Sequence, residues 1–257
     1  LHVLSRLRGK LMKGDGSDKG SMLAVVTTFD ALSAIIKEEK FDLVIANRNA
    51  PNQNVLSGAT AEIEKVEKLL TAKGIKAIRL PVAAAFHSAL VEPALKPFGA
   101  ALEKVAFAKP SIPVYANSTG TPYPDAPKAS RELLAGQLGK PVEFVKLVSG
   151  MAADGVTTIV ECGAGGRLTG LVGQIAPTVN ALAVDASNGK KNGIADLARV
   201  LAQLAALGHA VDLKGWQGGD AGVKDARPKP KLCVALTGAT HRSTPKKQFE
   251  KKVPVTM

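Results

Sequence analysis

The sequence of 257 residues lacks the features that mark membrane and secreted proteins. It contains no run of about 18 consecutive apolar residues, the length that a membrane-spanning helix needs, and no charged-then-apolar signal peptide at its start. Its two cysteines, Cys162 and Cys233, lie far apart and have no metal-type spacing with the four histidines. We therefore expect a soluble, cytoplasmic protein with ordinary thiols, no metal site and no membrane partner.

A serine nucleophile in a recognisable setting is also missing. No Gly-x-Ser-x-Gly elbow occurs, because the serines of the chain lack the flanking glycines. The first residue is Leu1 rather than methionine, and we expect the chain to be a segment of a longer polypeptide. A covalent catalyst built on this chain would need a nucleophile from residues before Leu1 or from another polypeptide.

Aromatic residues make up only 4% of the chain, although its net charge is +12. A basic chain with few aromatic residues has few side chains that could stack on nucleic-acid bases. Residues 224–257 hold nine Lys/Arg and two acidic residues, a net +7, so more than half of the excess charge lies there. No series of aromatic residues alternates with these charges to stack on bases. We interpret this tail as a solvated basic linker and expect no nucleic-acid partner.

Residues 21–80 have the pattern of a small α/β unit. Two amphipathic segments are typical of helices, and four short apolar segments are typical of strands. The expected order is βαββαβ, that of a ferredoxin-like subdomain inserted in a larger domain. Turn-forming residues at 48–52 separate the second strand from the third. The strands are expected at residues 22–27, 43–47, 53–57 and 76–80, and the helices at about 29–40 and 62–73.

The rest of the chain alternates strands and helices again, which favours a parallel sheet covered by helices on both faces. Residues 157–161 form a near-continuous apolar strand of the type that is buried on both faces. Beyond residue 207 the pattern fades into a linker with two short candidate strands, at 211–213 and 232–236. Further strands are expected around residues 113–117 and at 181–185, and helices at 1–12, from 87 to about 105, and at 130–138, 141–153, 168–175 and 194–207.

His87 lies where a strand pattern gives way to a helix pattern, within Pro-Val-Ala-Ala-Ala-Phe-His-Ser. Such a position lets a side chain face a cleft, and imidazole titrates close to neutral pH, as a general base requires. A partly buried structural histidine fits the same position, because a lone histidine carries no chemistry without partners.

The glycine-rich segment at residues 163–166 follows a strand and precedes a helix, and Asp185 ends the next strand. Rossmann-like proteins hold pyrophosphate or S-adenosylmethionine at such a turn. The third glycine of that fingerprint is missing, because Arg167 or Leu168 stands in its place. A tight strand-to-helix turn and a nucleotide-binding turn therefore both remain open.

Seven ordered segments resemble one family, the acyltransferase domains of polyketide and polyunsaturated-fatty-acid synthases and the related malonyl-CoA:acyl-carrier-protein transacylases. The resemblance covers about residues 4–207. It implies an α/β fold with a hydrolase-like parallel-sheet core, incomplete at its N-terminal side, and the inserted ferredoxin-like subdomain. The segments are residues 6–12, 20–25, 46–53, 84–88, 113–117, 137–144 and 161–169.

The resemblance implies roles for six residues. His87 is the expected general base for an elbow serine, and the backbone carbonyl at Gln137 is expected to hold its other ring nitrogen. Arg8 is expected to grip the free carboxylate of a malonyl group through two parallel charge-assisted bonds. Phe86 corresponds to the variant that favours malonyl over methylmalonyl, although it also fits a packed core residue. Supporting roles near the cleft are implied for Asn49 and Asn117.

The resemblance also implies an organisation and an activity. Residues 1–20 and 81–207 would form the acyltransferase core, residues 21–80 the inserted subdomain, and residues 208–257 the linker of a multidomain synthase. The expected activity moves a malonyl unit from malonyl-CoA to the phosphopantetheine thiol of an acidic acyl carrier protein, in polyketide or fatty acid synthesis beside neighbouring synthase domains. It is expected to need no metal and no tightly held cofactor. A non-catalytic module that docks carrier proteins stays open as the alternative, and so does the Rossmann-like binder.

Overall fold

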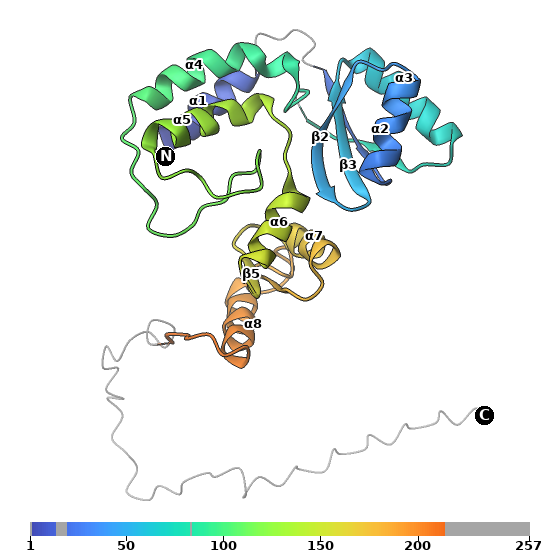
Figure 1. Ribbon diagram of the computed structural model, residues 1–257. Helices are drawn as coiled ribbons and strands as arrows, with labels where there is room; N and C mark the ends of the chain where they lie inside the picture. The colour runs from blue at the N-terminus through green and yellow to red at the C-terminus, as the bar shows by residue number, and fades with distance from the viewer. Residues whose placement is uncertain (1, 14–19, 83, 214–257) are drawn as a thin grey trace, which may run out of the picture. The chain divides into compact units, whose positions relative to one another are not determined.

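The computed structural model describes residues 2–13, 20–82 and 84–213 (Figure 1). The chain divides into two compact units, Leu1–His209 and Ala210–Met257. Every helix and strand described below lies in the first unit.

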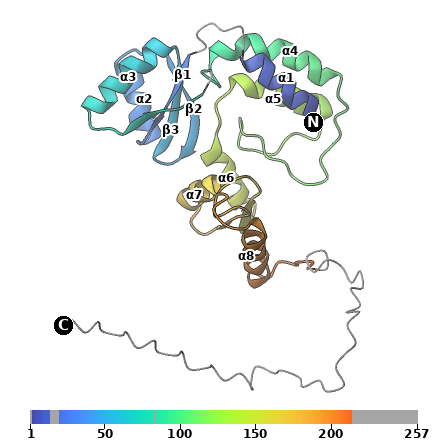
Figure 2. The ribbon, with the colours of Figure 1, turned by 180° about the vertical axis from the view of Figure 1, so that it is seen from behind.

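A four-stranded antiparallel sheet with two helices forms the ferredoxin-like subdomain. Its elements follow in the order β1 (Ser21–Val25), α2 (Phe29–Glu38), β2 (Leu43–Ala50), β3 (Gln53–Gly58), α3 (Thr60–Ala72) and β4 (Ala77–Arg79). The strand order in the sheet is β2-β3-β1-β4, and every neighbouring pair is antiparallel. The predicted βαββαβ order is therefore confirmed, and Figures 1 and 2 show both helices on the same face of the sheet.

Aliphatic side chains between this sheet and its helices form the subdomain's own core. Removing each such side chain from water stabilises the fold by about 1.5–3 kcal/mol. A local signal sets the start of α2, since the Thr28 hydroxyl accepts a hydrogen bond from the Ala31 amide at 3.3 Å and so caps the helix. The fully buried members of the core are Leu23, Val25, Leu32, Leu56, Ile63, Val66 and Leu70.

The turn expected at residues 48–52 is shorter than predicted. β2 continues through Ala50, and only Pro51 and Asn52 connect it to β3. The pairing of the two strands shifts register between Ile45 and Asn47 and again between Arg48 and Ala50. Such bulges accommodate extra residues in a strand that otherwise continues.

A group of helices surrounds a second core. It comprises α1 (His2–Lys13), the 3₁₀ turn η1 (Ala89–Val91), α4 (Glu92–Glu103), α5 (Pro127–Gly136) and the 3₁₀ turn η2 (Gln137–Gly139). Both α1 and α5 pack against α4 (Figure 2). The buried members of this core are Ala94, Phe98, Leu102 and Leu138, and Leu4, Leu11 and Met12 of α1 pack against them.

A parallel pair of strands forms the third part. It contains α6 (Phe144–Ala153), β5 (Thr158–Glu161), α7 (Arg167–Ile175), β6 (Asn180–Ala183) and α8 (Gly193–Ala206). Among the described residues β5 pairs with β6 alone. The prediction that β5 is buried on both faces is wrong, because each of its residues is half-buried in this two-stranded sheet.

Two expected strands are absent from the described residues. Around Tyr115 the chain makes a short irregular pairing with residues 121–123 instead of joining the parallel sheet. Pro110, Pro113 and Pro122 lack the amide hydrogen that a regular ladder needs. Residues 211–213 are not a strand, and residues 232–236 lie outside the described part. No helix in the described part of the chain is long and apolar enough to cross a membrane.

Candidate active site

His87 lies in an irregular segment between β4 and η1, close to the position that the sequence indicates. Its backbone φ angle is 60°, in the left-handed region. A non-glycine residue adopts that region at a cost of about 1–2 kcal/mol, and such backbone conformations concentrate at functional sites. The next residue, Ser88, is buried, and its hydroxyl donates to the Ala85 carbonyl at 2.6 Å.

The imidazole of His87 is held by the main chain. Its Nδ1 lies 3.2 Å from the carbonyl oxygen of Gln137 in η2. Because a carbonyl oxygen can only accept, Nδ1 carries the hydrogen in this contact and Nε2 is left as an acceptor. Burial of the ring lowers the pKa of His87 below 6.5, against the backbone contacts with Gln137 and Lys140, which raise it. The ring is therefore neutral at pH 7 and able to accept a proton at Nε2.

Arg8 of α1 lies within electrostatic range of His87. Its positive charge is one of the causes that lower the pKa of His87, and its side chain is half-buried. Arg8 and His87, which lie far apart in the sequence, are therefore close enough in space to interact electrostatically. A guanidinium there can bind a carboxylate with two parallel hydrogen bonds.

Phe86 packs onto the ferredoxin-like subdomain. Its half-buried ring contacts the cluster of Met22, Ala46 and Val55. Its carbonyl oxygen accepts a hydrogen bond of 2.8 Å from the hydroxyl of Ser57, which is fully buried in β3. Phe86 thus fills a structural role whatever its contact with substrate.

The two asparagines occupy different settings. Asn49 is half-buried and lies in the second bulge of β2, without a directly opposed residue on β3. Asn117 is exposed, and its carbonyl oxygen accepts from the Glu143 amide at 2.7 Å. Within the part of the chain that is described, no hydrogen bond joins either amide side chain to His87.

Sequence reasoning missed three polar residues next to these positions. Ser57 fixes the backbone directly before His87, and Arg48 pairs with Glu143 at 3.4 Å. The sequence contained one signal for Ser57, namely a polar residue within an apolar strand. A buried polar side chain is usually hydrogen-bonded, so such a residue is expected to have a specific partner. No local signal links Arg48 to Glu143, since they lie on elements far apart in the sequence.

The glycine turn is closed by carboxylates of the chain itself. The Gly165 and Gly189 amides both donate to Asp185, each at 2.9 Å, and the Thr169 amide donates to Glu161 at 2.8 Å. Hydrogen bonds from Thr169 lower the pKa of Glu161, against the opposing effect of burial. The carboxylates of Asp185 and Glu161 accept hydrogen bonds from amides that could otherwise bind a phosphate. Their negative charge also repels a phosphate group. The described residues also contain no cluster of three or more His, Cys, Asp or Glu suited to a metal ion.

Comparisons with known proteins agree on one family. The family described as "Acyl transferase domain" matches residues 3–198. The malonyl CoA-acyl carrier protein transacylase of Salmonella typhimurium is 35% identical over 187 residues, which are 71% of this chain and 60% of that protein. Polyketide synthase GfsA of Streptomyces halstedii is 32% identical over 219 residues, 83% of this chain and 3% of that protein.

Solved structures show the same similarity. The acyltransferase domain from the second module of the salinomycin polyketide synthase superposes with a TM-score of 0.75 at 30% identity, covering 88% of this chain and 52% of that chain. The transacylase of Clostridium perfringens gives a TM-score of 0.71 at 31% identity, covering 80% of this chain and 64% of that one. The chain thus spans between about half and two thirds of these two structures.

Proposed function

Because the chain belongs to the acyl transferase domain family, we propose that it forms the histidine-bearing part of an enzyme that loads acyl carrier proteins. The complete enzyme moves a malonyl unit from malonyl-CoA to the phosphopantetheine thiol of the carrier. The observation that carries this proposal is the hydrogen bond between Nδ1 of His87 and the Gln137 carbonyl, with the charge of Arg8 nearby.

In the first half-reaction, His87 acts as general base toward a serine hydroxyl that lies outside these 257 residues. The serine oxygen attacks the thioester carbonyl of malonyl-CoA while Nε2 of His87 takes the hydroxyl proton. The C–S bond then breaks, and the CoA sulfur leaves with the proton that His87 returns. The product is a malonyl ester on the serine.

In the second half-reaction, the carrier protein's thiol takes the place of the CoA thiol. Nε2 of His87 removes the thiol proton, the sulfur attacks the serine ester, and the serine oxygen leaves with that proton. The lowered pKa of His87 supports this role, because a neutral imidazole is ready to accept at both steps. The Gln137 carbonyl keeps the proton on Nδ1 and so keeps Nε2 free.

Arg8 and Phe86 select the cargo in this proposal. The Arg8 guanidinium binds the free carboxylate of the malonyl group, a contact that an acetyl group cannot make. Phe86 lies next to His87 and restricts the space beside the α-carbon of the acyl group. Asn49 and Asn117 support the cleft, the former through the bulge in β2 and the latter through its backbone.

The cellular setting we propose is polyketide or fatty acid synthesis. Relatives in both settings support it, namely a polyketide synthase and stand-alone transacylases. Residues 1–20 and 81–207 then form the acyltransferase core around the subdomain at 21–80, and residues 208–257 form a linker toward a neighbouring synthase domain.

The test is transfer of labelled malonyl from malonyl-CoA to a holo acyl carrier protein by the full-length protein that contains these residues. His87→Ala should lower the rate by about 10²–10⁴-fold, the usual contribution of a positioned base. His209→Ala is the matched control, since His209 contacts the Thr158 hydroxyl instead, and it should leave the rate unchanged. Equal rates for wild type and His87→Ala would contradict the assignment.

The net charge of +12 favours a second candidate, a module of the same fold that binds acidic carrier proteins without catalysis. That candidate predicts carrier binding but no malonyl transfer by the full-length protein. Malonyl transfer that depends on His87 would eliminate it.

A further inference from the structure

The segment of residues 137–143 connects the partner of His87 to the ferredoxin-like subdomain. At its start, the Gln137 carbonyl contacts Nδ1 of His87. Near its end, Val142 pairs with β2 as a short parallel bridge: its amide donates to the Ala46 carbonyl at 2.8 Å, and its carbonyl accepts from the Arg48 amide at 2.9 Å. The segment thus links the Gln137 carbonyl to β2 by a short stretch of backbone.

Glu143 ends the segment and is held on two sides. Its carboxylate forms an ion pair with the Arg48 guanidinium at 3.4 Å, and its amide donates to the Asn117 carbonyl at 2.7 Å. The Glu143 side chain is 13% exposed and that of Arg48 is 34% exposed, so solvent screens the carboxylate of this pair less than that of an exposed pair. By contrast, the partners of Arg79 on β4, Glu64 and Glu67, are 53% and 33% exposed.

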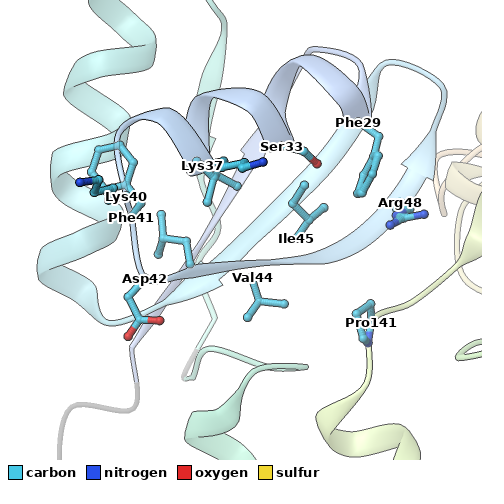
Figure 3. A pocket seen from close by; sticks show the side chains of 12 residues that line it. Phe29, Ser33, Lys37, Lys40, Phe41, Asp42, Val44, Ile45, Arg48 and Pro141 are labelled. Carbon is cyan, nitrogen blue, oxygen red and sulfur yellow. The ribbon is translucent and has the colours of Figure 1, made fainter.

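Arg48 is itself fixed in place. Its guanidinium carbon lies 3.4 Å from the centre of the Phe29 ring of α2, and its Nε atom is buried without a hydrogen-bond partner among the described residues. Figure 3 shows Arg48 between Phe29 and Pro141, at one end of the groove between α2 and β2. Stacking on an aromatic ring and pairing with a carboxylate together restrict the rotamers of an arginine.

We propose that Arg48 is a positioning residue: its ion pair with Glu143 holds the 137–143 segment to β2 and thereby keeps the Gln137 carbonyl against His87. The consequence is a fixed Nδ1–H tautomer of the imidazole. The importance of this tautomer for acyl transfer rests on the proposed function, but the tautomer itself is a property of this chain.

The test measures the tautomer of His87 by ¹⁵N NMR at a pH where the ring is neutral, with the His87 signals assigned by their loss in His87→Gln. In the wild type, Nδ1–H should be the major form. Arg48→Met keeps the aliphatic stem over Phe29 but removes the ion pair, and Nδ1–H should cease to be the major form. Glu143→Gln, which removes the same pair from the other side, should give the same shift.

Two further variants separate positioning from general stability. Arg79→Met removes the exposed ion pairs of β4 in the same subdomain and should leave the tautomer unchanged. The exchange Arg48→Glu with Glu143→Arg restores the pair in reverse and should recover the Nδ1–H form. A wild-type tautomer in folded Arg48→Met or in folded Glu143→Gln would overturn the proposal, as would a tautomer shift in Arg79→Met.

A kinetic measurement on the full-length protein completes the test. Arg48→Met should lower kcat for malonyl transfer by about 10- to 100-fold with little change in KM for malonyl-CoA, because a misplaced base slows the chemistry rather than substrate binding. An unchanged kcat would overturn the positioning role. A wild-type protein without any transfer activity would contradict the proposed function, while the NMR result would still decide the role of Arg48.

Discussion

The imidazole of His87 combines burial with a hydrogen bond from its Nδ1 to the main chain. The Gln137 carbonyl accepts a hydrogen bond from Nδ1, and the backbone of His87 lies in the left-handed region. Sequence patterns predicted neither feature, because they indicated only a histidine between a strand and a helix. The family resemblance added the Gln137 contact because ordered motifs carry information about pairs that are distant in the sequence.

The lowered pKa of His87 predicts how stability depends on pH. The unfolded chain protonates this ring near 6.5, whereas the folded protein protonates it at lower pH because burial disfavours the charged form. The unfolded state thus binds more protons between these values, so this contribution to stability is complete above pH 6.5 and is lost as the pH falls through the folded-state pKa.

Urea unfolding of wild type and His87→Gln across this pH range checks this prediction. The stability of the wild type should fall more than that of the variant as the pH decreases below 6.5. Parallel curves for the two proteins would show that His87 does not titrate with a lowered pKa.

Arg8 should determine the preference for a carboxylated acyl group. Arg8→Ala in the full-length protein should lower kcat/KM for malonyl-CoA by about 10- to 100-fold, the value of a lost charge-assisted contact, and leave kcat/KM for acetyl-CoA nearly unchanged. Arg6→Ala, an exposed residue of the same helix, is the control. An unchanged ratio of the two substrates would refute the role of Arg8.

At the level of helices and strands, periodicity succeeded where an element is set by its own residues. The βαββαβ order follows from two amphipathic helices and four short apolar strands, and all six occur close to the predicted bounds. The hairpin loop was misplaced because β2 extends through residues that favour turns, where Val142, far along the chain, pairs with it. Local sequence carries no sign of such a pairing.

The core of the ferredoxin-like sheet should be sensitive to truncation. Leu56 of β3 is fully buried, so Leu56→Ala should lower the free energy of unfolding by about 2–5 kcal/mol through lost burial and the cavity left behind. Ile78 of β4 is 54% exposed, and Ile78→Ala should change it by less than about 0.5 kcal/mol. Urea titration of both variants measures the difference, and equal losses would contradict the assigned core.

Among the described residues of the Leu1–His209 unit, three of the four hydrophobic clusters lie in largely separate stretches of the chain. One lies within the ferredoxin-like subdomain, a second joins α1, α4 and α5, and a third surrounds α6 and α7. Sequence patterns indicated the first from residues 21–80 alone. The same patterns predicted a larger parallel sheet than the two strands that pair in the described part of the chain. Alternation of strands and helices does not reveal how many strands pair.

Separate clusters predict separate opening reactions. In native-state hydrogen exchange, Leu56→Ala should accelerate exchange of the β1 and β3 amides and leave those of α6 unchanged. Val148→Ala, at a buried position of the third cluster, should have the opposite effect. Uniform acceleration of all amides by either variant would show that the unit unfolds as one cooperative whole.

The single pairing of β5 has a practical consequence for handling this chain. An edge strand with unpaired amides and carbonyls is a template on which another strand can add. Among the described residues no second strand pairs with that edge, and the half-buried residues of β5 include Ile159 and Val160. Purified on its own and concentrated, the chain should therefore self-associate edge to edge, and a lysine introduced at Val160 should keep it monomeric in sedimentation experiments.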